Sequence, residues 1–118
     1  QSVEKIMKDN LNKLIHVIDE FRMLHPDIQS QAMLSFIYIA MWSELDEPVY
    51  IKDVAEAVGV PSATASRNVT LLTKGTYRLN GLGLVTTHED PLYRTRKIIK
   101  LTSVGKKLAN RLRERMDQ

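Results

Sequence analysis

The stretch DVAEAVGVPSATASRNVTLL, residues 53–72, decides how this chain is interpreted. It places a small apolar residue, Ala55, four positions before Gly59, and from Ser62 to Thr70 it carries short side chains with Arg67 as the only charge. Glycine readily supplies the left-handed turn that ends one helix before another begins. Serine, threonine and asparagine are poor helix formers. The second helix is therefore either an ordinary surface helix or a helix kept slim so that it can enter a DNA groove.

A helix-turn-helix motif accounts for this pattern. In such a motif the second helix enters the major groove while the first crosses behind it. Ala55 would lie where the two helices touch, and four apolar side chains would face the core. These are Val58, Val60, Val69 and Leu72.

The outward face of the second helix is predicted to contact DNA. Short hydroxyl side chains can bond to phosphates and bases, a methyl group can contact thymine, and arginine can bridge the two acceptors of guanine. The candidate residues of this recognition helix are Ser62, Ala63, Thr64, Ser66, Arg67, Thr70 and Lys74.

The charge distribution favours a polyanionic partner for the same half of the chain. The 118 residues carry a net charge of +3, but residues 1–50 hold four basic and eight acidic side chains, whereas residues 51–118 hold thirteen basic and six acidic ones. A split of this kind indicates two faces with different partners. The basic half contains the helix-turn-helix pattern, so nucleic acid is the partner expected for it.

Other classes of function find little support. The chain has no cysteine, which excludes disulfides and cysteine-ligated zinc. His16, His25 and His88 lack partners at ligand spacing, so we expect neither a metal nor a cofactor. The sequence shows no nucleophile–base pair, phosphate loop or carboxylate cluster, so we do not expect an enzyme. The longest apolar run, residues 32–42, is too short to span a bilayer, and no secretory leader pattern is present, so a cytoplasmic protein is expected.

A long amphipathic helix is predicted over residues 3–24. Met7, Leu11, Leu14, Ile18 and Phe21 recur at steps of four, three, four and three, the spacing of a helix packed along another helix. Its apolar surface is wider than one stripe, which favours burial of the excess in a partner. The proline of the HPD sequence at 25–27 ends the helix.

The remaining elements follow in order. Ser30 is a plausible N-cap for a nearly all-apolar second helix at about 31–44, and a short extended VYI segment precedes the helix-turn-helix, whose second helix is expected to end near Lys74. A loop with three glycines is expected next. A last helix, capped by Thr102 or Ser103, has an apolar stripe and a basic face that is expected to be solvated or paired with acidic residues.

A charged β-hairpin is predicted between the loop and the last helix. The runs GLVTTH (83–88) and RKIIKL (96–101) read as strands, and the proline in the joining segment EDPLYRT favours a turn. A hairpin in this place can act as a wing that reaches the adjacent minor groove or the DNA backbone. Its candidate contacts are Arg94, Arg96 and Lys97.

The complete order resembles the MarR family of winged helix-turn-helix regulators. The resemblance lies in DVAEAVGVPSATASRNVTLLTKG, in the GLV that enters the wing, and in LTSVGKKL, where a strand runs into the final helix. It implies a mainly α fold with a β-hairpin: a single domain over 1–118, with a DNA-binding lobe at 49–101 and helical extensions at 1–28 and 103–118 that form a dimer interface. The expected interface residues are Met7, Leu11, Leu14, Ile18, Leu108 and Leu112.

The resemblance also implies a homodimeric repressor that binds double-stranded DNA at an inverted-repeat operator. A small-molecule effector is typical of the family, but no residue pattern here specifies one. Two segments depart from the family pattern: the wing EDPLYRTRK has extra bulky residues, and KGTYRLNGLGLV is longer than the usual connection to the wing. Asn68 replaces a usually apolar residue, so it should make a buried hydrogen bond or lie at an edge.

Two alternatives stay open at this point. A winged helix can serve as a protein-interaction adaptor without contacting DNA. A replication or partition factor would use the same motif on DNA for another purpose.

Overall fold

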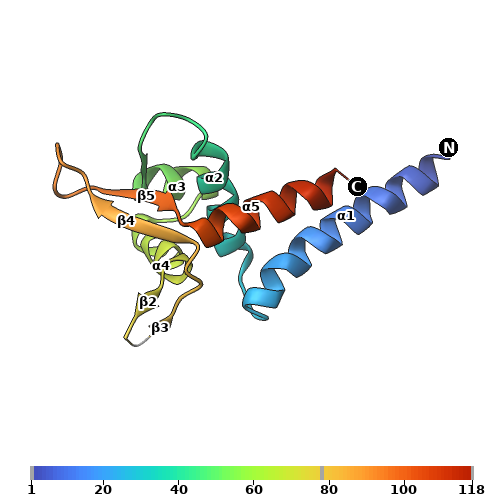
Figure 1. Ribbon diagram of the computed structural model, residues 1–118, viewed down its shortest axis with the longest axis horizontal. Helices are drawn as coiled ribbons and strands as arrows, with labels where there is room; N and C mark the ends of the chain where they lie inside the picture. The colour runs from blue at the N-terminus through green and yellow to red at the C-terminus, as the bar shows by residue number, and fades with distance from the viewer. Residues whose placement is uncertain (1, 78, 118) are drawn as a thin grey trace.

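The computed structural model describes residues 2–77 and 79–117. The elements follow in the order α1 (Val3–Leu24), α2 (Ser30–Trp42), β1 (Val49–Tyr50), α3 (Ile51–Val58), α4 (Ser62–Leu72), β2 (Gly75–Thr76), β3 (Leu79–Asn80), β4 (Val85–Glu89), β5 (Lys97–Leu101) and α5 (Ser103–Met116). α2, α3, α4 and the strands form a lobe from which α1 and α5 extend together, as Figure 1 shows. No helix within the described residues is long and apolar enough to cross a membrane.

α1 begins and ends where the sequence predicts. The Ser2 side chain accepts a hydrogen bond from the Lys5 backbone N–H at 3.1 Å, which satisfies one of the free donors at the start of the helix. At the other end the His25 N–H still bonds to the Phe21 carbonyl, and Pro26 follows. α2 differs slightly from its prediction, because Gln29 rather than Ser30 is the N-cap residue and the helix ends at Trp42.

α3 and α4 form the predicted helix-turn-helix. The Asp53 carboxylate accepts a hydrogen bond from the Tyr50 backbone N–H at 2.9 Å, which fixes the start of α3. Gly59 ends α3 with φ = 82°, a left-handed conformation that favours glycine. Ala55 is buried, as expected for a residue at the contact between the two helices.

The strands form two separate sheets. β4 and β5 pair in antiparallel fashion, with Val85 opposite Leu101, and β1 adds to the other edge of β5. The prediction of a loop between α4 and the wing was wrong, because β2 and β3 pair there as a second short hairpin, with Gly75 opposite Asn80. Strands of two residues are too short to show the alternation from which a strand is predicted.

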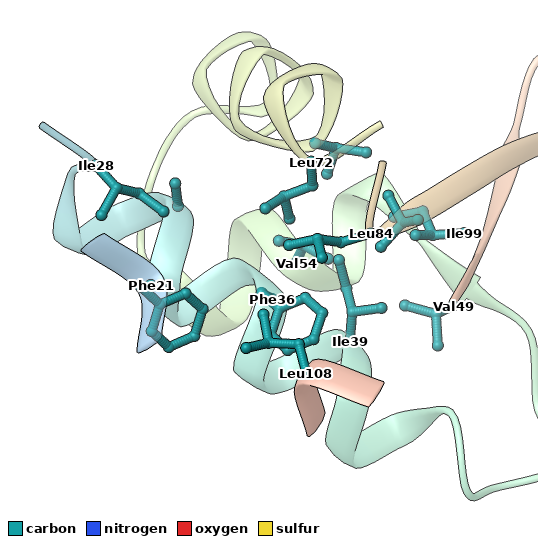
Figure 2. Packing of buried hydrophobic residues seen from close by; sticks show 13 residues of the cluster. Phe21, Ile28, Phe36, Ile39, Val49, Val54, Leu72, Leu84, Ile99 and Leu108 are labelled. Carbon is teal, nitrogen blue, oxygen red and sulfur yellow. The ribbon is translucent and has the colours of Figure 1, made fainter. Parts of the chain in front are cut away.

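One apolar core joins the lobe to the two long helices. Figure 2 shows Phe21 of α1, Phe36 and Ile39 of α2, Val54 of α3 and Leu108 of α5 meeting in it. The Phe21 and Phe36 rings meet edge to face, with their centroids 5.8 Å apart. Each such side chain contributes roughly 1.5–3 kcal/mol by leaving water. The same core therefore fixes the direction in which α1 and α5 leave the lobe.

The position of Leu108 corrects one expectation. It was predicted to lie at a dimer interface, but it is 0% exposed within its own chain. The four-residue stripe of α5 turns Leu108 toward the lobe, where Leu112 also packs against the core. Leu108 therefore anchors α5 and is not available to a partner.

Candidate nucleic-acid interface

α4 presents a slim polar face to solvent. Ala65, Val69 and Leu72 are buried and fix the rotation of the helix on the lobe. Of the residues predicted to contact DNA, Ser62, Ala63, Ser66, Arg67 and Lys74 are exposed, whereas Thr64 and Thr70 are half-buried. At 3.6 residues per turn, Ala63, Arg67 and Thr70 share the side of the helix axis that faces away from the core. Lys74 was predicted to lie on the recognition helix, but α4 ends at Leu72, so Lys74 lies in the turn that follows it.

Two side-chain contacts order this face. The Arg67 Nη2 donates to the Thr64 Oγ1 at 3.2 Å, one turn back along the helix. The Thr70 hydroxyl donates to the Ser66 carbonyl at 2.9 Å, so its oxygen still has acceptor capacity. Arg67 is therefore held along α4 with further guanidinium donors available.

Asn68 lies at the edge of the lobe. Its Nδ2 donates to the Gln31 Oε1 of α2 over 3.5 Å, a long hydrogen bond between partly buried groups. The sequence predicted that Asn68 would make a buried hydrogen bond or lie at an edge, and the second alternative holds. The contact also links α4 to α2.

A groove of about 670 Å³ separates α4 from the wing. One wall is built from α4 residues and the other from the wing and the start of α3. Its lining residues include Ser62, Ser66, Thr70, Thr76, Thr87, Thr95, Lys52, Arg96 and Lys97. Within the described part of the chain, these lining side chains include three cations and no carboxylate. The groove can therefore accept an anionic backbone without like-charge repulsion.

A side-chain network at Asp90 organises the wing (β4, β5 and the turn between them). Asp90 is 4% exposed; its Oδ2 accepts from the Tyr50 hydroxyl at 2.5 Å, and its Oδ1 accepts from the Leu92 N–H at 2.8 Å. The Asp90 backbone N–H bonds to the Arg96 carbonyl at 3.0 Å. These contacts close the turn and tie it to β1.

This network shifts two pKa values. The hydrogen bond from Tyr50, helped by the Leu92 N–H and by the nearby Arg96 charge, lowers the pKa of the Asp90 carboxyl below its usual value. The same hydrogen bond and the nearby carboxylate raise the pKa of the Tyr50 hydroxyl. Asp90 is therefore charged and Tyr50 neutral at neutral pH.

The predicted wing residues take different positions. The Arg96 guanidinium lies over the Tyr93 ring, 4.7 Å from its centroid, and 5.7 Å from the centroid of Tyr50. These aromatic contacts direct Arg96 toward the groove, beside Lys97. Arg94 is exposed in the turn and is not among the groove residues.

Sequence reasoning missed several residues of this groove. Lys52, Thr87 and Thr95 line it, although they come from three separate segments. Their residue types are unremarkable, and only the packing of α3 and the wing against α4 brings them together. Asp90 was also missed, although an aspartate before a proline is a recognised start signal for a turn.

The predicted dimer residues of α1 are exposed. Met7, Leu11, Leu14 and Ile18 keep 58%, 53%, 49% and 44% of their surface accessible. Nearer the lobe, α1 is fixed by the buried Glu20, which accepts from Arg111 Nε at 3.0 Å and from Arg115 Nε at 3.4 Å. The sequence suggested the acidic N-terminal half of the other subunit as a partner for the basic face of the last helix, whereas Glu20 provides such a partner within the same chain.

Comparison with known proteins establishes the fold. The structure is similar to Staphylococcus aureus MepR in its DNA complex, with a TM-score of 0.71 and 20% identity over 97% of this chain and 81% of MepR. The transcriptional regulator Tm0710 from Thermotoga maritima matches with a TM-score of 0.62 and 18% identity, over 97% of this chain and 68% of its own.

The PcaV transcriptional regulator from Streptomyces coelicolor, in complex with its natural ligand, matches with a TM-score of 0.57 and 22% identity over 77% of this chain and 57% of PcaV. No protein-family model and no curated protein matches the sequence. The predicted fold, a winged helix-turn-helix of the MarR type with N- and C-terminal helices, is confirmed.

Proposed function

We propose that this protein is a transcriptional regulator that binds double-stranded DNA as a homodimer. The observation that carries the proposal is the surface formed by α4 and the wing: a slim polar helix face beside a groove whose described lining residues include cations and no carboxylates. The MepR–DNA complex provides a precedent for this fold on DNA. Regulation of transcription would place the protein in the cytoplasm.

The residues have separate roles in this proposal. Arg67, Ser66 and Ala63 would lie against base edges in the major groove, where arginine pairs best with guanine. Lys52, Arg96 and Lys97 would bind phosphates and supply affinity that depends on salt but not on sequence. Arg94 in the wing turn would reach the backbone or the neighbouring minor groove.

The function can be tested with operators selected from random duplexes. The wild-type protein should enrich an inverted repeat and bind it at least about a thousandfold more tightly than random DNA, as measured by fluorescence anisotropy at several salt concentrations. Arg67→Ala should cost about 1–3 kcal/mol on the selected site and much less on random DNA. Arg113→Ala, which removes an exposed arginine from α5, is the matched control and should change neither affinity.

Two results would contradict the proposal. Equal losses on both DNAs would make Arg67 a phosphate contact. If no duplex binds even at low salt, the basic surface serves a protein partner, as in an adaptor.

The exposed apolar stripe of α1 supports the dimer. Met7, Leu11, Leu14 and Ile18 lie on one side of a helix that extends beyond the lobe (Figure 1), and no other described segment of the chain covers them. A partner's α1 and α5 would bury this stripe. Two recognition helices about 34–36 Å apart would then enter successive major grooves, which explains the expected inverted repeat.

Leu14→Lys should break the dimer without unfolding the lobe. The half-exposed side chain contributes little to the core of its own chain, but a lysine in a dimer interface would place a charge among apolar groups. Sedimentation velocity should show a shift from dimer to monomer at micromolar concentration. Asn12→Lys introduces the same charge on the opposite side of α1 and should remain dimeric; a monomeric wild type would refute the interface.

A further inference from the structure

The β2–β3 hairpin leaves the C-terminal end of α4 on a different side from the wing. Figure 1 shows the two hairpins diverging from the region of α4, with the wing at the far left and β2–β3 at the bottom. Gly75 and Thr76 of β2 line the same groove as the α4 and wing residues. The hairpin is therefore continuous with the surface proposed to bind DNA.

The base of this hairpin is rigidly attached to α4. The Leu82 N–H bonds to the Leu71 carbonyl of α4 at 2.9 Å, and just after the helix the Gly81 N–H bonds to the Lys74 carbonyl and the Gly83 N–H to the Thr73 carbonyl, both at 2.9 Å. The Thr73 hydroxyl donates to the Thr70 carbonyl at 2.6 Å and accepts from the Gly75 N–H at 3.0 Å. A binding partner that contacts the outer face of α4 must therefore also contact the hairpin or lie beside it, in an orientation that the hairpin fixes.

The composition of the region suits a polyanion. The sequence has no aspartate or glutamate between Glu56 and Glu89, a span that includes α4, both strands of the hairpin and the start of the wing. Lys74 is exposed at the hairpin base, and Tyr77 keeps 91% of its surface accessible. Lysine and tyrosine are common phosphate-binding side chains in protein–DNA complexes.

From this continuity, rigidity and charge we propose that the β2–β3 hairpin is a second wing. It contacts the sugar–phosphate backbone of the same duplex that α4 enters, at the rim of the major groove, through Lys74, Thr76 and Tyr77. This inference rests on the proposed DNA-binding function and adds a contact element to it. Because the contacts are to backbone, the hairpin adds affinity and footprint length but no base preference.

A shortened hairpin gives the first test. Gly75 and Gly81 lie close enough that residues 76–80 can be replaced by Asn-Gly, a dipeptide that favours a tight hairpin turn. On the wild-type protein's selected operator, the shortened variant should bind roughly tenfold more weakly and lose hydroxyl-radical protection at the edge of the footprint, because it lacks the hydrogen bonds from Thr76 and Tyr77 to charged phosphates. Its ranking of operator variants should be unchanged.

Point variants separate a DNA contact from support of the fold. Tyr77→Ala removes a side chain that lies outside the core, so it should leave the unfolding temperature unchanged and still weaken DNA binding several-fold. Lys74→Ala should reduce the slope of log affinity against log salt by about one unit. Leu45→Ala, an exposed apolar residue in the α2–β1 loop, is the control and should have no effect.

The outcomes are distinct from those that test the function. Unchanged affinity and footprint in the shortened and Tyr77→Ala variants, with normal binding by the wild type, would overturn the second wing and leave the regulator intact. A shortened variant that loses its base preference would also overturn it, because the hairpin would then only support α4. Failure of the wild type to bind any duplex would overturn both proposals.

Discussion

The two hairpins beside α4 are held in place by different kinds of contact. β2–β3 is attached through backbone hydrogen bonds to the last turn of α4 and through the close passage of glycine backbones at Gly75 and Gly81. The wing pairs with β1 through the backbone of β5, but its turn is attached through side chains: Asp90 bonds to Tyr50, and Arg96 lies over Tyr50 and Tyr93. Backbone contacts tolerate most changes of side chain except an added Cβ, whereas a side-chain network depends on individual functional groups and on pH.

The largest effect is expected from Gly81→Ala. A Cβ at this position would overlap the Thr73 carbonyl oxygen and the backbone of residues 74 and 75, none of which can move without breaking the hairpin base. We expect a loss of about 3 kcal/mol in the free energy of unfolding, measured by urea denaturation.

Gly83→Ala is the matched control for that change. Gly83 has φ = 68°, but no other part of the chain lies within 4 Å of the position a Cβ would take. The alanine should therefore lower the free energy of unfolding only by its left-handed strain, about 1 kcal/mol. Equal losses for the two variants would mean that the close approach at Gly81 does not hold the hairpin.

Asp90→Asn should loosen the wing and leave β2–β3 unaffected. An amide has only one acceptor oxygen, so it cannot accept from both the Tyr50 hydroxyl and the Leu92 N–H. Amide hydrogen exchange at Leu92 should accelerate by roughly tenfold or more, while Gly81 and Gly83 keep their protection. Faster exchange in both hairpins would show that they are not independent.

The wing should also respond to pH in a predictable direction. The lowered pKa of Asp90 means that its contribution to stability is present above the ordinary carboxyl pKa of about 3.9 and is lost as the pH falls through its folded value. The raised pKa of Tyr50 means that its contribution is present below about pH 10 and is lost as the pH rises through its folded value. The backbone hydrogen bonds at the base of β2–β3 do not titrate.

Tyr50→Phe should have the smallest effect on stability, and it tests whether the Tyr50 hydroxyl is the main cause of the low Asp90 pKa. The ring that faces Arg96 remains, but the largest cause of the low Asp90 pKa is removed. The pKa of Asp90 should rise toward its ordinary value, as measured by carbon-detected NMR titration. Val49→Ala, a neighbouring change that keeps the hydroxyl, should leave that pKa low; an unchanged pKa in Tyr50→Phe would assign it to Leu92 and Arg96 instead.

The sequence predicted the regular parts of the fold closely. α1 begins at Val3 and ends at Leu24 as expected, Gly59 makes the turn, and Thr102 caps α5 by accepting from the Gly105 N–H. These features are local, since caps, glycine turns and apolar periodicity act within a few residues. β2–β3 could not be predicted in this way, because its two-residue strands depend on how the chain returns to α4.

The candidate site was predicted in its helix but only partly in its groove. The exposed face of α4 follows from the periodicity of Ala65, Val69 and Leu72, which the sequence displays. Lys52, Thr87 and Thr95 carry no such signal, because they become neighbours only when α3 and the wing pack beside α4. Leu108 is a different case. The sequence showed the apolar stripe of α5 that contains it, but it did not show whether a partner or the core of the same chain covers that stripe.

By itself, the sequence determined which segments are helices, which face of α4 is slim and polar, and where positive charge gathers, because each property depends on residues a few positions apart. The tertiary structure alone decided that β1 from before α3 pairs with β5, that Glu20 holds Arg111 and Arg115, and that two hairpins flank one groove. These are contacts between residues distant in the chain, and their energies exist only once the common core has brought the elements together.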